Sequence, residues 1–152
     1  MVEMKKGQCF ATAVRKASRR LTQLYDEALA PSGLRSTQFS ILAELVLRAA
    51  PPTVMELAEA MVSDRSSLGH ALRPLVRDGY VVLRRGETDR RTQEIVLTKR
   101  GRATYREALA QWRGAQKTVE SLYGEEWSET MRAAVLRIAG DERLGAMTRG
   151  EA

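Results

Sequence analysis

The feature that most constrains the fold is residues 80–98, which predict two short strands joined by a charged loop. The segments YVVLR and QEIVLT are rich in β-branched residues, and the loop GETDRRT separates them. Two helical segments precede the strands, TVMELAEAM and SDRSSLGHALRPLVRDG. Helix, turn, helix and a two-stranded wing thus follow one another, which is the order of a winged helix-turn-helix. We therefore predict a mainly α fold with a small β-wing (α+β).

Capping patterns support this order. Thr53 and Glu56 form a T-x-x-E capping box, in which the hydroxyl and the carboxylate satisfy free backbone amides. Ser63 or Asp64 is placed to cap the following helix, and Gly79 suits the left-handed turn that ends it. The first helix of the unit is therefore expected to begin after Thr53, and the second to end before Gly79.

Two helices are predicted upstream of this unit. Apolar residues recur every three or four positions over residues 8–29, which indicates a long amphipathic helix ended by Pro31 and Gly33. A second helix begins near residue 36 and stops before the proline pair at 51 and 52, because proline lacks the amide donor that a helix needs.

Two more helices are predicted after the wing. Thr98 caps a long segment with near-heptad apolar spacing, which Gly124 breaks. A last helix spans residues 126–139 and ends at Gly140, and the polar tail beyond it is left without an assigned structure.

The apolar faces of the terminal helices exceed what a small DNA-binding core needs, which predicts a homodimer. We expect residues 1–34 and 103–152 to form a helical dimerisation region and residues 35–102 to form the DNA-binding region, all within a single compact unit. The leading interface candidates are Trp112, Leu122, Trp127, Met131, Val135 and Ile138. Packing within one chain is the alternative for these side chains.

Positive charge is concentrated in the predicted DNA-binding region. The chain of 152 residues has a formal net charge of +6. Residues 63–102 hold ten Lys or Arg against five Asp or Glu, so that this segment alone carries +5. A local positive potential attracts polyphosphate, although a merely solvated surface is the alternative.

Composition disfavours several other classes of protein. No apolar run approaches the ~20 residues that cross a bilayer, and MVEMKKGQCF lacks the apolar core of a signal peptide, so we expect a cytoplasmic protein. One cysteine and one histidine are too few for a usual structural zinc site, and we expect no metal or cofactor. Cys9 and His70, the obvious nucleophile and base, lie about sixty residues apart in separate helices, so we do not expect an enzyme.

The second helix of the helix-turn-helix has an apolar side and a polar side. At about 100° per residue, Leu68, Leu72, Leu75 and Val76 fall together, opposite an arc of hydroxyl, imidazole and guanidinium groups. Such groups reach base edges and phosphates in a major groove, although a solvated helix face carries them too. The candidate DNA contacts are Arg65, Ser66, Ser67, His70, Arg73 and Arg77. Pro74 predicts a modest bend, because it removes one amide bond.

The wing loop adds cations at a hairpin tip. We expect Arg90 in the minor groove, where the electronegative floor attracts a guanidinium. Arg91 is compatible either with a DNA contact or with an ion pair to Asp89 that stiffens the loop. A solvated hairpin without a DNA contact is the alternative.

Taken together, four segments resemble the MarR family of bacterial transcription regulators. They are ALAPSGLRSTQFSIL, VMELAEAMVSDRSSLGHALRPLVRDGYV, GETDRRTQEIVLT and TKRGR, and the order of predicted helices matches over essentially the whole chain. The resemblance implies a homodimer with two wings, in which the first, fifth and sixth helices intertwine. It also implies a sequence-specific regulator of double-stranded DNA that binds a palindromic operator, usually as a repressor.

The resemblance further implies regulation. MarR-like regulators often release DNA when a small aromatic acid or phenol binds between the dimerisation and DNA-binding parts. Arg15, Tyr25 and Phe39 are candidates to line such a site, with core packing for the aromatics and solvation for Arg15 as alternatives. Peroxide-sensing members carry a reactive cysteine near Cys9, which keeps thiol-based redox sensing open against an inert role. A non-specific architectural DNA-binding protein is the remaining alternative.

Overall fold

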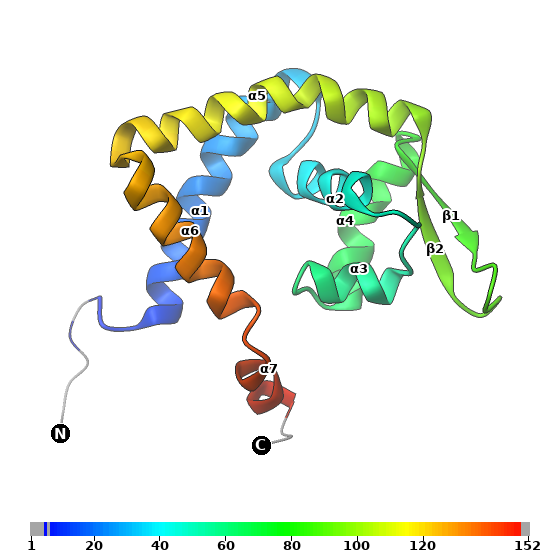
Figure 1. Ribbon diagram of the computed structural model, residues 1–152. Helices are drawn as coiled ribbons and strands as arrows, with labels where there is room; N and C mark the ends of the chain where they lie inside the picture. The colour runs from blue at the N-terminus through cyan, green and yellow to red at the C-terminus, as the bar shows by residue number, and fades with distance from the viewer. Residues whose placement is uncertain (1–4, 6, 150–152) are drawn as a thin grey trace. The chain divides into compact units, whose positions relative to one another are not determined.

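The computed structural model describes residue 5 and residues 7–149, and it confirms a mainly helical fold with one small antiparallel sheet (Figure 1). The chain divides into two compact units, Met1–Ala115 and Gln116–Ala152, which are described separately. The elements are α1 (Phe10–Leu29), a 3-10 turn η1 (Ala30–Ser32), α2 (Ser36–Leu47), α3 (Val54–Ala60), α4 (Arg65–Arg77), β1 (Val81–Arg85), β2 (Gln93–Leu97), α5 (Lys99–Tyr123), α6 (Glu125–Ala139) and α7 (Glu142–Arg149). None of the described helices is both long enough and apolar enough to span a bilayer.

The predicted helix boundaries are close to the observed ones. The capping box of α3 is formed, since Thr53 Oγ1 accepts from the Glu56 amide at 3.2 Å and the Glu56 carboxylate accepts from the Thr53 amide at 2.7 Å. Gly79 adopts a φ of 73° after α4, as its position in the sequence predicts. Helix α2 ends earlier than expected, because Arg48 is already extended at φ −88° and ψ 142°.

The C-terminal tail is helical. No structure was assigned from the sequence to the residues beyond Gly140, and the structure places helix α7 at Glu142–Arg149. The Asp141 side chain accepts from the backbone amide of Arg143 at 3.0 Å and pairs with its guanidinium at 2.6 Å. The guanidinium lowers the pKa of Asp141 to about 2, so the capping carboxylate is charged at neutral pH.

The core of the first unit lies between α5 and the helix-turn-helix (Figure 1). Phe39 of α2 is buried and stacks on two rings of α5, Tyr105 at 5.2 Å and Trp112 at 6.0 Å between ring centroids. The largest fully buried side chains are Leu29, Ile41, Leu42, Leu57, Leu75, Val81 and Ile95. Val76 was expected on this buried side, but it lies at the edge of the apolar face of α4 and is 39% exposed.

Two polar contacts of Asp26 join α1 to the start of α2. Asp26 of α1 accepts from the Ser36 amide at 2.7 Å and from the Arg35 guanidinium at 3.2 Å, so a side chain of α1 satisfies a free amide at the start of α2. Burial raises the pKa of Asp26, but the hydrogen bonds from Ser36 and Arg35 outweigh it and the net pKa is lowered.

The wing is held against the helix-turn-helix by backbone contacts. β1 and β2 pair from Val81 opposite Leu97 to Arg85 opposite Gln93. On its other edge β2 meets the linker before α3, where the Ile95 amide donates to the Pro52 carbonyl at 2.9 Å. The wing is therefore anchored on both sides of β2.

The second unit exposes many apolar side chains. Gly124, with a φ of 88°, turns the chain from α5 into α6, and Tyr123 stacks on Trp127 across this turn at 4.7 Å. Trp127 and Ile138 of α6 are 49% and 54% exposed. On the first unit, Phe10 at the start of α1 is 87% exposed. These apolar side chains are not covered by the described residues of a single chain.

Gly101 in the first turn of α5 is expected to be essential for packing. A Cβ atom at this position would overlap the Tyr80 carbonyl oxygen and approach Leu97 Cδ1 to 2.9 Å. We predict that Gly101→Ala lowers the free energy of unfolding by about 1–3 kcal/mol, as is typical of overpacking. Chemical denaturation followed by circular dichroism measures this change.

Gly114→Ala is the matched control on the same helix. A Cβ atom at Gly114 meets no heavy atom within 4 Å, and alanine favours a helix by up to about 1 kcal/mol over glycine. Gly114→Ala is therefore expected to leave stability unchanged or higher. A loss at Gly114 as large as that at Gly101 would contradict the packing argument.

Candidate nucleic-acid interface

Helix α4 presents a polar face because its apolar face is fixed in the core. Leu68, Leu72 and Leu75 are at most 3% exposed, whereas Ser66, His70 and Arg73 lie on the exposed side. Arg65 and Arg73 take part in no ion pair with the described residues. The exposed hydroxyl, imidazole and guanidinium groups are therefore available for contacts outside the chain.

Ser67, another predicted contact, is engaged at the start of the helix. Asp64 is the N-cap of α4, and its carboxylate accepts from the Ser67 amide at 2.8 Å and from the Ser67 hydroxyl at 2.6 Å. The Ser67 hydroxyl is the main cause that lowers the pKa of Asp64. The Ser67 hydroxyl therefore contributes to capping, and its hydrogen is committed to the carboxylate.

Arg77, at the end of α4, is also engaged. Its Nε donates to Asp78 Oδ1 at 2.8 Å and its Nη2 donates to Asp78 Oδ2 at 3.1 Å, which is a bidentate pair. Contact with a phosphate would have to compete with this neighbouring carboxylate. Of the six predicted residues of α4, the side chains of Ser67 and Arg77 thus have a partner, and the other four side chains have none among the described residues.

The wing tip is organised around Asp89. Its carboxylate accepts from the backbone amide of Arg91 at 2.9 Å and pairs with the Arg91 guanidinium at 3.2 Å, and the backbone hydrogen bond is the main cause of the lowered pKa of Asp89. The Asp89 carbonyl accepts from the amide and the hydroxyl of Thr92. Gly86 lies against Thr92, and the close approach requires glycine because a Cβ atom at this position would overlap Thr92 Oγ1. These contacts give the tip a defined shape.

The two arginines of the tip therefore differ. Arg91 pairs with Asp89, whereas Arg90 is exposed and takes part in no ion pair with the described residues. The Arg91 guanidinium is thus engaged within the loop, whereas the Arg90 guanidinium is not engaged by the described residues.

Arg85 is a wing residue that sequence reasoning did not single out. On β1, Arg84 pairs with Glu94 at 3.0 Å and with Glu87 at 3.1 Å, whereas Arg85 is exposed and has no ion pair among the described residues. The alternation of side chains along a strand puts Arg84 and Arg85 on opposite faces, which was the available signal. Arg85 adds a cation next to the wing loop that no described residue neutralises.

The candidate ligand residues lie on two helices, Arg15 and Tyr25 on α1 and Phe39 on α2. Arg15 is exposed and Tyr25 is half-buried, and ten residues of α1, about 15 Å, separate them. Phe39 is in the aromatic stack of the core. Gln111 precedes Trp112 on α5, and its Oε1 atom is buried and has no hydrogen-bond partner among the described residues.

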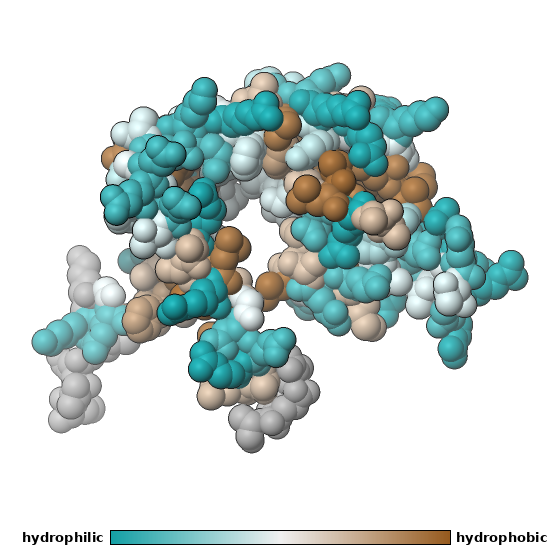
Figure 2. Space-filling view, viewed as in Figure 1, coloured by the Kyte–Doolittle hydropathy of each residue, from teal (hydrophilic) through white to brown (hydrophobic). Residues whose placement is uncertain are grey.

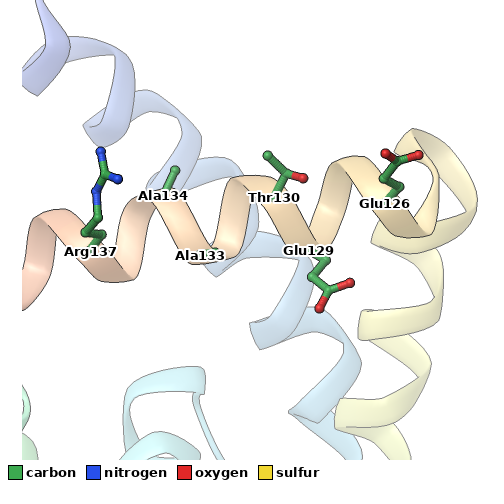
Figure 3. Close-up of a pocket in the computed structure, with 6 residues that line it drawn as sticks. All are labelled: Glu126, Glu129, Thr130, Ala133, Ala134 and Arg137. Atoms are coloured by element: carbon green, nitrogen blue, oxygen red, sulfur yellow. The ribbon is translucent and has the colours of Figure 1, made fainter.

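The hollow shown in Figure 3 is formed by residues of one helix. Its lining residues are Glu126, Glu129, Thr130, Ala133, Ala134 and Arg137 of α6. None of the candidate ligand residues contributes to it, and the Glu129 side chain points away from the side on which Glu126 and Thr130 lie. Among the described residues, no cluster of His, Cys, Asp or Glu is suited to a metal ion.

Cys9 immediately precedes α1 and is half-buried. The hydroxyl of Thr12 is the main cause that lowers the pKa of the Cys9 thiol, and the Thr12 amide and the charge of Arg15 act in the same direction. His70, the other residue considered for catalysis, lies in the middle of α4.

Comparison with known proteins agrees with this geometry. The model of the MarR family matches residues 32–92. The transcriptional regulator MosR of Mycobacterium tuberculosis, solved in complex with DNA, is 38% identical, with a TM-score of 0.76 over 86% of this chain and 93% of MosR. The repressor CouR of Rhodococcus jostii, bound to a 23-mer DNA duplex, is 25% identical, with a TM-score of 0.78 over 91% and 99% of the two chains.

A third structure supports the fold alone. PcaV of Streptomyces coelicolor, solved with its natural ligand, is 17% identical, with a TM-score of 0.79 over 91% of this chain and 97% of PcaV. Comparison with curated protein sequences gives no match.

The class of protein that the helix-turn-helix and the wing define is a winged-helix transcription regulator. The chain belongs to the MarR family of such regulators, as the sequence motifs indicated.

Proposed function

We propose that this MarR-family regulator binds an inverted-repeat operator in double-stranded DNA as a homodimer and represses transcription. The observation that carries the proposal is the exposed face of α4, with Ser66, His70 and Arg73, next to a wing whose Arg90 has no partner within the described chain. A major groove accepts such a helix, and a minor groove accepts such an arginine. The DNA complex of the 38% identical MosR supports this role.

The apolar surface that one chain leaves exposed supports a two-fold dimer. Phe10 on α1 and Leu122, Trp127 and Ile138 on α5 and α6 are each at least 49% exposed. Burying such side chains between two copies is favourable by roughly 25 cal/mol per Å². A two-fold dimer places two α4 helices in successive major grooves about 34 Å apart, which requires an inverted repeat. Trp112 packs on Phe39 within the chain and is the weakest of the interface candidates.

We further propose that a small aromatic or phenolic ligand releases the DNA. A ligand shifts the equilibrium only if it binds better to a conformation whose two α4 helices do not fit the operator. The aromatic stack of buried Phe39 with partly buried Tyr105 and Trp112 offers chemistry suited to an aromatic ligand, as does the Gln111 oxygen, which has no hydrogen-bond partner among the described residues. CouR bound to p-coumaroyl-CoA and PcaV bound to its ligand are structural precedents. Tyr25 and Arg15 remain candidates at the α1 side.

Sequence-specific binding is tested by selecting genomic fragments on the purified protein and competing them with random duplex. We expect one inverted-repeat fragment to be retained against about a thousandfold excess of random duplex, because specific sites bind typically 10³-fold or more tightly. A set of aromatic acids added to the complex is expected to include one that releases it. Equal competition by random duplex would instead indicate an architectural DNA-binding protein.

Arg90 and Arg91 form a matched pair of adjacent arginines for testing the wing. We predict that Arg90→Ala weakens operator binding and reduces the slope of log K against log[salt] by about 0.9, the contribution of one phosphate-neutralising cation. Arg91→Ala is expected to change the slope less, since its guanidinium is already paired with Asp89. Fluorescence anisotropy at several salt concentrations gives both slopes. An unchanged slope for Arg90→Ala would rule out its assignment to DNA.

Thiol-based regulation is a second candidate function, favoured by the position of Cys9. The lowered pKa of the thiol increases the fraction of thiolate, which is the form that peroxide oxidises. We predict that peroxide weakens operator binding by the wild type and not by Cys9→Ser. Iodoacetamide labelling followed over pH 6–9 would show half-maximal reactivity below the ordinary pKa of a cysteine. Slow labelling at neutral pH and DNA binding indifferent to peroxide would leave Cys9 an inert residue.

A further inference from the structure

Helix α5 carries a row of cations that the proposed DNA contacts do not use. Lys99, Arg102, Arg106 and Arg113 recur at intervals of three, four and seven residues, so at about 100° per residue they fall within an arc of about 60°. The row is about 21 Å long at 1.5 Å per residue. All four side chains are exposed, and none forms an ion pair with the described residues. We call these four residues the α5 cationic stripe.

The α5 cationic stripe faces away from the helix-turn-helix. On the opposite side of α5, Ala108 is completely buried, and Trp112 stacks on Phe39 of α2. Figure 1 shows α2, α4 and α3 beneath the first part of α5, and Figure 2 shows hydrophilic side chains along the outer edge of this helix. Within the first unit, the stripe and the exposed face of α4 are therefore separate surfaces, one on each side of the core.

The charge pattern of the stripe differs from that of an ordinary solvated helix face. Residues 99–115 contain five Lys or Arg and one acidic residue, Glu107, which lies to the side of the stripe. Arg100, the fifth cation, lies over the Tyr80 ring at 5.4 Å. Like charges three or four residues apart, as at Arg102 and Arg106, destabilise a helix, and soluble surfaces usually intersperse both signs. The unneutralised row therefore points to an anionic partner.

The chemistry of the stripe fits the phosphate backbone of a duplex. Three of its four cations are arginines, whose guanidinium groups bind phosphate oxygens in a bidentate manner. No aromatic side chain belongs to the stripe, whereas single-stranded nucleic acid is bound by base stacking. The residues between the cations on this face, Ala103 and Ala110, are too small to insert into a membrane interface.

We propose that the α5 cationic stripe binds the backbone of a second DNA duplex while α4 and the wing hold the operator, so that one regulator bridges two DNA segments. The bridging part rests on the proposed operator binding, whereas the stripe's affinity for duplex does not. Because the stripe contacts only phosphates, the second segment is bound without regard to sequence. Its affinity depends steeply on salt, since each phosphate contact releases counterions.

The test is a bridging assay with the full chain. A biotinylated operator duplex on beads is saturated with protein and washed, and a fluorescent random duplex is then added at about 50 mM salt. The stripe variant is Arg102→Gln, Arg106→Gln and Arg113→Gln. The matched control is Lys16→Gln, Arg19→Gln and Arg20→Gln, which removes three cations of α1 that are also exposed and form no ion pair with the described residues.

We expect the stripe variant to capture at least tenfold less of the fluorescent duplex than the wild type and the control. Its affinity for the operator at one dimer per duplex should stay within twofold. Capture by the stripe variant equal to that of the wild type would overturn the proposal, because the two α4 helices of a dimer would then be responsible. An equal loss in the control would overturn it too, since net charge alone would explain both results.

A second measurement separates the stripe from the proposed operator binding. In a His70→Ala, Arg90→Ala background, residual binding to random duplex is measured by anisotropy over a range of salt concentrations. Adding the stripe substitutions should lower the slope of log K against log[salt] by about 2.7, or 0.9 for each of three cations. An unchanged slope would overturn the proposal whether or not an operator exists. Binding of the wild type to phosphatidylglycerol vesicles without duplex capture would also overturn it.

Discussion

The position of the wing relative to α4 depends on Ile95. This residue is completely buried, it lies opposite Leu83 in the wing, and its amide donates to the Pro52 carbonyl just before α3. Strand β2 thus connects the wing, the linker that precedes α3 and the hydrophobic core. A wing held only by its hairpin would be marginally stable in water, because an isolated two-stranded sheet lacks a buried face. The shared core gives α4 and the wing tip a fixed spacing, which groove recognition requires.

Local patterns in the sequence were sufficient for most of the fold. The capping box at Thr53 and Glu56, the N-cap at Asp64 and the left-handed turn at Gly79 depend on residues close in the chain, and all three are present. The exposure of Val76 was not predicted, because helical periodicity gives the direction of a side chain and not the width of the surface that covers it. Helix α7 was missed although Asp141 stands at its cap, since its short apolar face offers a weak periodic signal.

The candidate site was predictable in its residue types and less so in its partners. The sequence places six polar residues on α4, but only the structure pairs Ser67 with Asp64 and Arg77 with Asp78. Each pairing depends on the torsion angles of the two side chains, and helical periodicity does not specify these angles. The same applies to the ligand candidates, because the stacking of Phe39 on α5 joins residues that are far apart in sequence.

Hydrogen bonds of Thr98, just before α5, connect the wing to the neighbouring helices. Thr98 Oγ1 donates to the Gly79 carbonyl at 2.7 Å, and the same oxygen accepts from the Gly101 amide at 3.0 Å. These hydrogen bonds join the end of α4, the beginning of β1 and the first turn of α5. The packing there is tight, because a Cβ atom at Gly101 would overlap the Tyr80 carbonyl oxygen. A wing joined to the core in this way is expected to move together with α4 and the start of α5 and not on its own. If a small molecule releases the DNA, as proposed above, the release is expected to come from a rotation in which α4, the wing and the first half of α5 turn together as one rigid body.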